Sequence, residues 1–144
     1  MAVLQTQGPG VCPVSPLSAG EADYILIIDD DEAICNLIEL ALGDEGYEVA
    51  CCTDPVAALG LVAERPPGLI LLDLRMPTMD GASFVRAYRA LPNSAAPIVV
   101  FSALPNAEQY AARFGAVGSI AKPFNLDDLL AVVSQALSLF ARGL

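Results

Sequence analysis

Short apolar runs alternate with amphipathic segments from Tyr24 onward, and this alternation restricts the fold more than any other feature of the sequence. An uninterrupted apolar run is typical of a parallel strand that is buried on both faces. Each run is followed by a segment long enough for a helix that crosses back over the sheet. The predicted strands are Tyr24–Ile28, Glu48–Cys52, Leu69–Leu72, Ile98–Phe101 and Ser119–Ala121.

Helical patterns fill the connections between these strands. Apolar residues recur at helical spacing from Ile34 to Leu42 and again from Leu126 to Phe140, as on the buried face of an amphipathic helix. Asp54 followed by Pro55 predicts a helix start, and Asn125 predicts the cap of the last helix. The other two helices are expected at Ala82–Ala90 and Asn106–Phe114. Five βα units predict an α/β fold, a doubly wound parallel sheet with helices on both faces.

The composition predicts one domain with an N-terminal extension. Residues 1–22 are rich in Pro, Gly, Ser and Gln and lack hydrophobic periodicity, which predicts a flexible extension before a domain at residues 23–144. Apolar residues make up 55% of the chain, yet no run approaches the roughly 18 consecutive apolar residues of a membrane helix. The N-terminus lacks the basic region and apolar block of a secretory signal. We therefore expect a cytoplasmic protein without membrane insertion.

The charge balance limits the partners of the chain. Its net charge is −10, and it has seven Lys and Arg residues in total. Binding to nucleic acid depends on basic side chains that neutralise phosphates, so direct nucleic-acid binding is not expected. Proteins and cations are the expected partners.

The four cysteines contain no C-x-x-C pair, and the chain has no histidine. Cys51 and Cys52 are adjacent in a predicted strand, where neighbouring side chains point to opposite faces. Zinc sites and disulfide frameworks usually have more regular spacing. We expect buried or inert thiols.

Polar side chains follow the predicted strands at their carboxyl ends, namely Asp29, Asp30, Asp73, Ser102 and Lys122. Taken singly, each has a structural explanation, such as capping of a helix by Asp30 or a turn at Asp73. Ligands of open parallel sheets bind at this edge, however, and the residues converge there. Carboxylates placed together repel one another unless a cation lies between them, and oxygen ligands suit Mg²⁺. The joint placement favours a magnesium site.

With these residues in place, the chain resembles the receiver domain of bacterial response regulators, the CheY-like family, over about Tyr24–Phe140. The resemblance is carried by the acidic pair in ILIIDDDEA, the aspartate in LILLDLRMPTMDG, the hydroxyl in PIVVFSA and the lysine in AKPFNLDDL. It implies a flavodoxin-like (βα)5 sheet with strand order 2-1-3-4-5. It also suggests a cis peptide bond between Lys122 and Pro123.

The same resemblance implies that the chain takes part in phosphoryl transfer. Asp73 would accept a phosphoryl group from a histidine kinase or a histidine phosphotransfer protein, and the chain would promote its own phosphorylation and dephosphorylation rather than turn over a small substrate. Lys122 and Ser102 would contact phosphoryl oxygens. The implied Mg²⁺ ligands are Asp29, Asp30, Asp73 and the backbone carbonyl of Arg75. The downstream target is not identified by the sequence.

One position departs from the family pattern. Ser119 stands three residues before Lys122, where these receivers usually carry Tyr or Phe. Serine lacks the apolar area that makes the burial of a ring energetically decisive. We therefore expect a weaker or differently routed response to phosphorylation over residues 104–121.

The sequence argues against several other functional classes. A haloacid-dehalogenase-type phosphatase has a second aspartate two residues after its nucleophile, and here that position is Arg75. A flavin binder needs a loop that attracts phosphate after the first strand, whereas this chain has three acids there. A calcium loop starting at Asp29 lacks its central glycine. The alternative that remains is a receiver-like interaction module that signals without phosphorylation.

Overall fold

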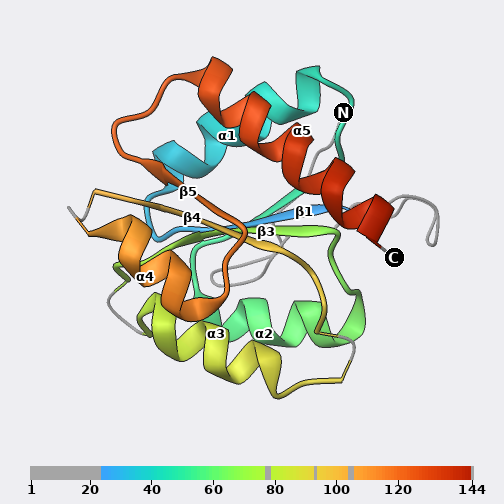
Figure 1. Cartoon of the computed structure of the whole chain (residues 1–144), viewed down its shortest axis with the longest axis vertical. Coiled ribbons are helices and arrows are strands. Elements are labelled where there is room, and N and C mark those ends of the chain that lie inside the picture. The colour runs from blue at the N-terminus through green and yellow to red at the C-terminus, as the bar shows by residue number, and fades with distance from the viewer. Residues whose placement is uncertain (1–23, 77–78, 93, 104–105, 144) are drawn as a thin grey trace.

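The structure, a computed structural model, describes residues 24–76, 79–92, 94–103 and 106–143, and the side chains of these ranges up to residue 138. Within this part, parallel strands form one sheet in the order β2-β1-β3-β4-β5 (Figure 1). The strands are β1 (Ile25–Ile28), β2 (Val49–Cys52), β3 (Leu69–Asp73), β4 (Ile98–Ser102) and β5 (Gly118–Ala121). The helices are α1 (Glu32–Asp44), α2 (Pro55–Glu64), α3 (Gly81–Arg89), α4 (Ala107–Phe114) and α5 (Leu126–Gly143). The doubly wound fold and its predicted strand order are confirmed.

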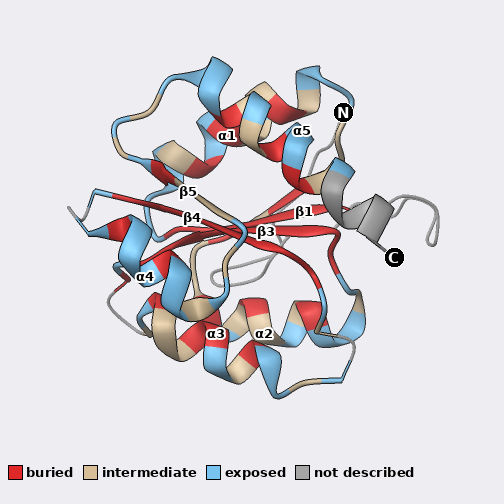
Figure 2. Cartoon of the chain, viewed as in Figure 1, coloured by how far each residue is buried: buried red, intermediate tan, exposed pale blue. Residues whose placement is uncertain are grey.

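Helices cover both faces of the sheet, with α1 and α5 on one side and α2, α3 and α4 on the other (Figure 1). Side chains alternate along β1, so Ile25 and Ile27 pack against α1 and α5, while Leu26 and Ile28 pack toward the opposite layer. All four are buried, and Figure 2 shows β1, β3 and β4 as buried strands. Full burial of each such side chain contributes about 1.5–3 kcal/mol. Burial on two faces explains the uninterrupted apolar runs of β1, β3 and β4.

Local signals fix the helix ends where the sequence places them. The Asp54 carboxylate accepts a hydrogen bond from the backbone N–H of Val56 at 3.0 Å, and the Asn125 side chain accepts one from Asp128 at 2.8 Å. Each bond satisfies a backbone donor that the first turn of a helix leaves without an intrahelical partner. Gly115 ends α4 in the left-handed conformation, with φ of 74°. These three boundaries therefore follow from short-range interactions.

Some predictions fall outside the described residues. The predicted extension at residues 1–22 and the side chain of Phe140 are among them. None of the described helices combines the length and apolar character that a membrane crossing requires.

The expectation of buried or inert thiols is wrong for Cys35 and Cys51, and Cys52 is disulfide-bonded as well. A disulfide joins Cys35 of α1 to Cys51 of β2, and their Cα atoms lie 6.0 Å apart. Alternation along β2 turns Cys51 toward α1, while Cys52 points into the opposite layer. The two bonded residues are 16 positions apart in the sequence, and the packing of α1 on β2 brings them together. No local spacing rule could have predicted the bridge.

Candidate metal centre

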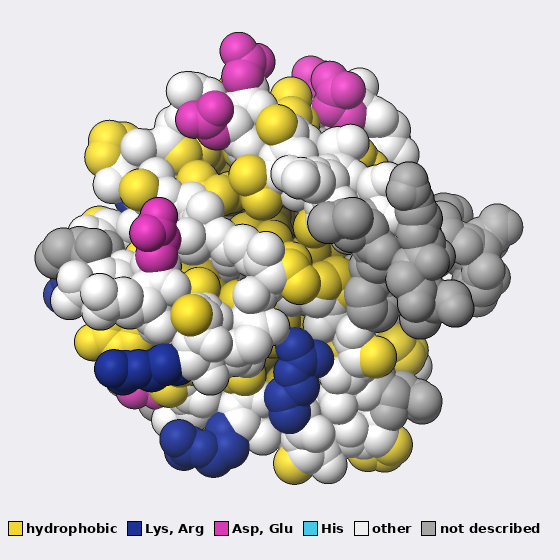
Figure 3. Space-filling view, in the orientation of Figure 1, with side chains coloured by type: hydrophobic (Ala, Val, Ile, Leu, Met, Phe, Trp, Pro, Cys, Tyr) yellow, Lys and Arg dark blue, Asp and Glu magenta, His cyan; other side chains and the backbone are white. Residues whose placement is uncertain are grey.

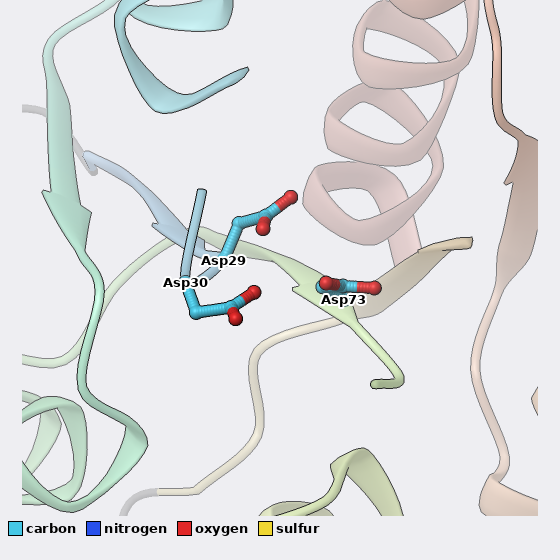
Figure 4. A group of neighbouring side chains, drawn as sticks. All are labelled: Asp29, Asp30 and Asp73. Carbon is cyan, nitrogen blue, oxygen red and sulfur yellow. The ribbon is translucent and has the colours of Figure 1, made fainter. Parts of the chain in front are cut away.

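Pairing of β1 with β3 brings two carboxylates side by side. The parallel register matches Ile28 with Leu72, so the next residues, Asp29 and Asp73, are neighbours at the carboxyl edge of the sheet. Asp29 is fully buried and Asp73 is 5% exposed. Asp30 is exposed at the rim, and one carboxylate oxygen from each of the three aspartates lies within 4.8 Å of the others (Figure 4). The structure thus gathers three of the predicted site residues.

Asp29 is held by contacts to both of its carboxylate oxygens. The backbone N–H of Asp31 donates to Oδ1 at 2.9 Å, and the Lys122 ammonium donates to Oδ2 at 2.9 Å. A lysine from the loop after β5 therefore reaches across the sheet edge to β1. Lys122 Nζ also lies 3.6 Å from Asp73 Oδ2, so its shorter ion pair is the one with Asp29.

Asp73 is held less tightly. Its Oδ1 accepts a hydrogen bond from the backbone N–H of Arg75 at 3.3 Å, and its Oδ2 lies 3.6 Å from Lys122 Nζ. Burial and the neighbouring Asp29 carboxylate raise the pKa of Asp73 to about 6, although Lys122 acts in the opposite direction. The ionised form of Asp73 is therefore disfavoured by its surroundings at this site.

Ser102 and Lys122 lie at the carboxyl ends of β4 and β5. Ser102 is fully buried at the end of β4, the strand next to β3, and its backbone carbonyl accepts a hydrogen bond from the Lys122 N–H at 2.9 Å. This bond holds the start of the loop after β5 against β4. The Lys122–Pro123 peptide bond is cis, as the resemblance suggested.

Phe101 contributes to the site although sequence reasoning treated it only as a strand residue. Lys122 Nζ lies 4.9 Å from the centre of the Phe101 ring, within the range of a cation–π interaction. Phe101 pairs with Asp73 in the β3–β4 register. The sequence signal that could have identified Phe101 is its place directly before Ser102 in the chain.

Ser119 lies away from the carboxylates, beside a groove of about 350 Å³ on the face formed by β5 and α5. Figure 3 views this side of the molecule and shows apolar side chains gathered between α4 and α5. The lining includes Val99, Val117, Ser119, Val132 and Ala136. The small side chain at position 119 thus borders open space.

The donor set fits a hard divalent cation. Each carboxylate supplies oxygen ligands, which Mg²⁺ and Ca²⁺ prefer. Lys122 offsets part of the negative charge of Asp29 and Asp73. The pKa of Asp73 is still raised, first by burial and then by repulsion from the Asp29 carboxylate. A bound cation would relieve that repulsion.

Comparison with known proteins agrees with this arrangement. The family model for the response regulator receiver domain matches residues 25–134. The chain belongs to the response regulator receiver family. This receiver is 34% identical over 117 residues to the regulatory protein AtoC of Escherichia coli K12, covering 80% of this chain and 25% of AtoC. It is 37% identical over 115 residues to PrrA of Mycobacterium tuberculosis, covering 78% of this chain and 49% of PrrA. It therefore spans a quarter to a half of these relatives.

Solved receiver structures share the fold. A CheY-like receiver from Methanospirillum hungatei superposes with a TM-score of 0.76 at 27% identity, covering 84% of this chain and 98% of the other. The receiver domain of the sensor histidine kinase PA1611 from Pseudomonas aeruginosa has a TM-score of 0.73 at 28% identity, covering 81% and 98%. That structure carries a magnesium ion coordinated in its active-site cleft.

Proposed function

We propose that Asp73 of this receiver accepts a phosphoryl group from the phosphohistidine of a sensor histidine kinase or a histidine phosphotransfer protein. The observation that carries the proposal is the buried Asp73 carboxylate, gathered with Asp29 and Asp30 and facing Lys122. A phosphoacceptor needs a nucleophilic oxygen at an accessible edge, together with positive charge around it. The family membership supports the same reading.

The magnesium ligands follow from the donor set. Asp29, Asp30 and Asp73 would hold the ion together with the backbone carbonyl of Arg75, as the resemblance implies. Mg²⁺ bound there would supply positive charge that offsets the repulsion between the carboxylates and an incoming phosphoryl group. Magnesium is a proposal for this chain, supported by its acidic cluster and by the ion in the related PA1611 receiver.

The transfer itself uses the side chains of the receiver. An oxygen of the ionised Asp73 forms a bond to phosphorus, the bond from phosphorus to the histidine nitrogen breaks, and that nitrogen keeps the electron pair and takes up a proton. Lys122 Nζ, at 2.9 Å from Asp29 and 3.6 Å from Asp73, can turn toward a phosphoryl oxygen as charge develops. The Ser102 hydroxyl is the proposed donor to another oxygen. Both groups would then sense the phosphorylated state.

Intact-mass measurement after incubation with Mg²⁺ and acetyl phosphate tests the assignment. The wild-type chain should gain one phosphoryl group, and Asp73→Asn should gain none. Asp54→Asn is the matched control, because it makes the same chemical change at a helix cap outside the site. Phosphorylation of the Asp73→Asn variant would reject Asp73 as the acceptor.

The same samples separate the proposal from the alternative of an interaction module that signals without phosphorylation. Titration with Mg²⁺ should show binding in the wild-type chain and weaker binding in Asp30→Ala. A wild-type chain that binds neither Mg²⁺ nor a phosphoryl group would favour the interaction module. The cytoplasmic location stays a prediction.

A further inference from the structure

The disulfide between Cys35 and Cys51 lies next to the backbone of Asp29, one of the three clustered aspartates. Cys35 is in the first turns of α1, which begins just after Asp31, and Cys51 is the third residue of β2. Cys35 is 2% exposed, whereas Cys51 is half-buried. The separation of 6.0 Å between their Cα atoms is within the usual range for a disulfide. The bridge therefore ties α1 to the outer strand of the sheet next to the site.

Asp29 connects this bridge to the site. Cys35 Sγ lies 3.5 Å from the backbone carbonyl oxygen of Asp29. The backbone N–H of Asp29 donates to the carbonyl of Cys52 at 3.1 Å, directly after Cys51 in β2. The backbone of Asp29 thus contacts both elements that the bridge joins, while its carboxylate binds Lys122. Any change in how α1 sits on β2 acts on the position of Asp29.

We propose that Cys35 and Cys51 are a reversible redox modification site, oxidised by a small-molecule disulfide such as oxidised glutathione, and that the bridge tightens Mg²⁺ binding at the adjacent carboxylates. The coupling to Mg²⁺ rests on the proposed function, whereas the redox site does not. Cys51 is half-buried, so a reagent can reach it. Asp29 contacts Cys35 and Cys52 through its backbone and carries one of the clustered carboxylates, so it links the bridge to the acidic cluster. In reducing compartments disulfides are usually transient or redox-sensing, so a bridge in a chain expected to be cytoplasmic favours a reversible site.

Oxidation of the two cysteines proceeds by two successive thiol–disulfide exchange steps. The Cys51 thiol loses its proton, and its sulfur attacks one sulfur of oxidised glutathione, which releases one molecule of glutathione as the thiol. The Cys35 thiol then loses its proton, and its sulfur attacks Cys51 Sγ and releases the second glutathione. Two protein thiols are oxidised to one disulfide, and one glutathione disulfide is reduced to two thiols. The burial of Cys35 assigns the first attack to Cys51.

Oxidation changes the constraint on the site. A reduced Cys35 thiol can donate a weak hydrogen bond to the Asp29 carbonyl, whereas the disulfide replaces it with a covalent link from α1 to β2. The structure contains that link together with carboxylates that are already gathered within 4.8 Å. Holding ligands in their binding arrangement lowers the cost of ordering them when a cation binds. The oxidised chain should therefore bind Mg²⁺ more tightly than the reduced chain.

Peptide mapping tests the redox site on the full chain. Samples are equilibrated with oxidised or reduced glutathione, alkylated, and cut after acidic residues, since Glu39 and Glu45 separate the two cysteines. Oxidation should yield a peptide pair linked through Cys35 and Cys51, and reduction should release it. Cys51→Ser should lose this pair, while Cys12→Ser should keep it. A chain whose Cys35 and Cys51 stay alkylated as free thiols under oxidising conditions would overturn the proposal.

Calorimetric titration with Mg²⁺ tests the coupling on the same samples. The oxidised wild-type chain should bind Mg²⁺ about fivefold more tightly than the reduced chain, the lower end of typical coupling between sites. Cys51→Ser should bind equally under both conditions, and Cys35→Ala serves the same purpose if the first variant does not fold. Equal or weaker binding by the oxidised wild-type chain would overturn the coupling. If the wild-type chain shows the redox effect on Mg²⁺ binding but takes up no phosphoryl group, that result would reject only the proposed phosphoacceptor role.

Discussion

Replacing Asp73 with Asn should stabilise the metal-free receiver, although it removes the proposed acceptor. Burial and the Asp29 carboxylate disfavour the charge on Asp73, and the amide of Asn has a similar shape without that charge. The amide oxygen can still accept the hydrogen bond from the Arg75 N–H, and Lys122 keeps its shorter contact with Asp29. The substitution therefore relieves a repulsion and leaves the main contacts of the site in place.

The size of the effect follows from the pKa of Asp73, which is 3.8 in its ordinary state and about 6 in the folded chain. The folded state holds the proton more tightly than the unfolded chain, so the stability contributed by the protonated group is complete below about pH 4. It is lost as the pH rises through about 6. The difference between these two pKa values corresponds to roughly 3 kcal/mol. The advantage of Asp73→Asn should grow from about 1 kcal/mol at about pH 4.5 to about 3 kcal/mol at about pH 8.

Urea unfolding in the presence of a chelator measures this difference at both pH values. Asp54→Asn is the control, because Asn and Asp cap helices about equally well, and its stability should follow the wild-type chain. Adding Mg²⁺ at about 1,000 times the Kd of the wild-type chain should reverse the order of wild type and Asp73→Asn at about pH 8, since such a ligand stabilises the folded state by about 4.1 kcal/mol. If Asp73→Asn matches the wild-type chain in chelator at both pH values, the folded state does not disfavour the charge on Asp73.

Four further outcomes are expected. Asp30→Ala should weaken Mg²⁺ binding about tenfold or more, measured by calorimetry, and a comparable loss in Asp54→Ala would contradict the assignment of the cluster. Mg²⁺ affinity should rise with pH through about 6, because the Asp73 carboxylate must lose its proton to bind the ion. A flat profile from about pH 5 to 8 would argue against Asp73 as a ligand. Gly81→Ala should destabilise the chain by about 1–3 kcal/mol in urea unfolding. A Cβ there would lie 2.7 Å from Leu74 Cδ2 and 3.0 Å from Leu74 Cα, so wild-type stability would show that this contact relaxes freely. In NMR spectra with beryllofluoride, the amides around Ser119 should shift less than those lining the acidic cluster; equal shifts, together with no effect of Ser119→Tyr, would show that the absent ring is unimportant.

Interactions between residues close in sequence determined much of what could be predicted. Burial on two faces requires apolar side chains along β1 and most of β3 and β4, so these strands appear as uninterrupted apolar runs, and their predicted ends lie within one residue of the observed ends. Caps such as Asp54 and Asn125 satisfy backbone donors two or three residues away, so they also act locally. Because all parallel strands end at the same edge, the strand positions also predicted that Asp29 and Asp73 meet.

Packing over long sequence distances decided the rest. Lys122 pairs most closely with Asp29, which is 93 residues away, because the order of the strands and the loop after β5 set how far its ammonium reaches. Gly81 is needed because the start of α3 approaches Leu74 closely, and its φ is not positive. Cys35 and Cys51 meet because α1 packs on the face of β2 to which alternation directs Cys51.

The sequence by itself determined which residues form elements and which edge carries the polar groups, since those depend on local periodicity. The tertiary structure decided which side chains touch, because contact depends on how separate elements dock.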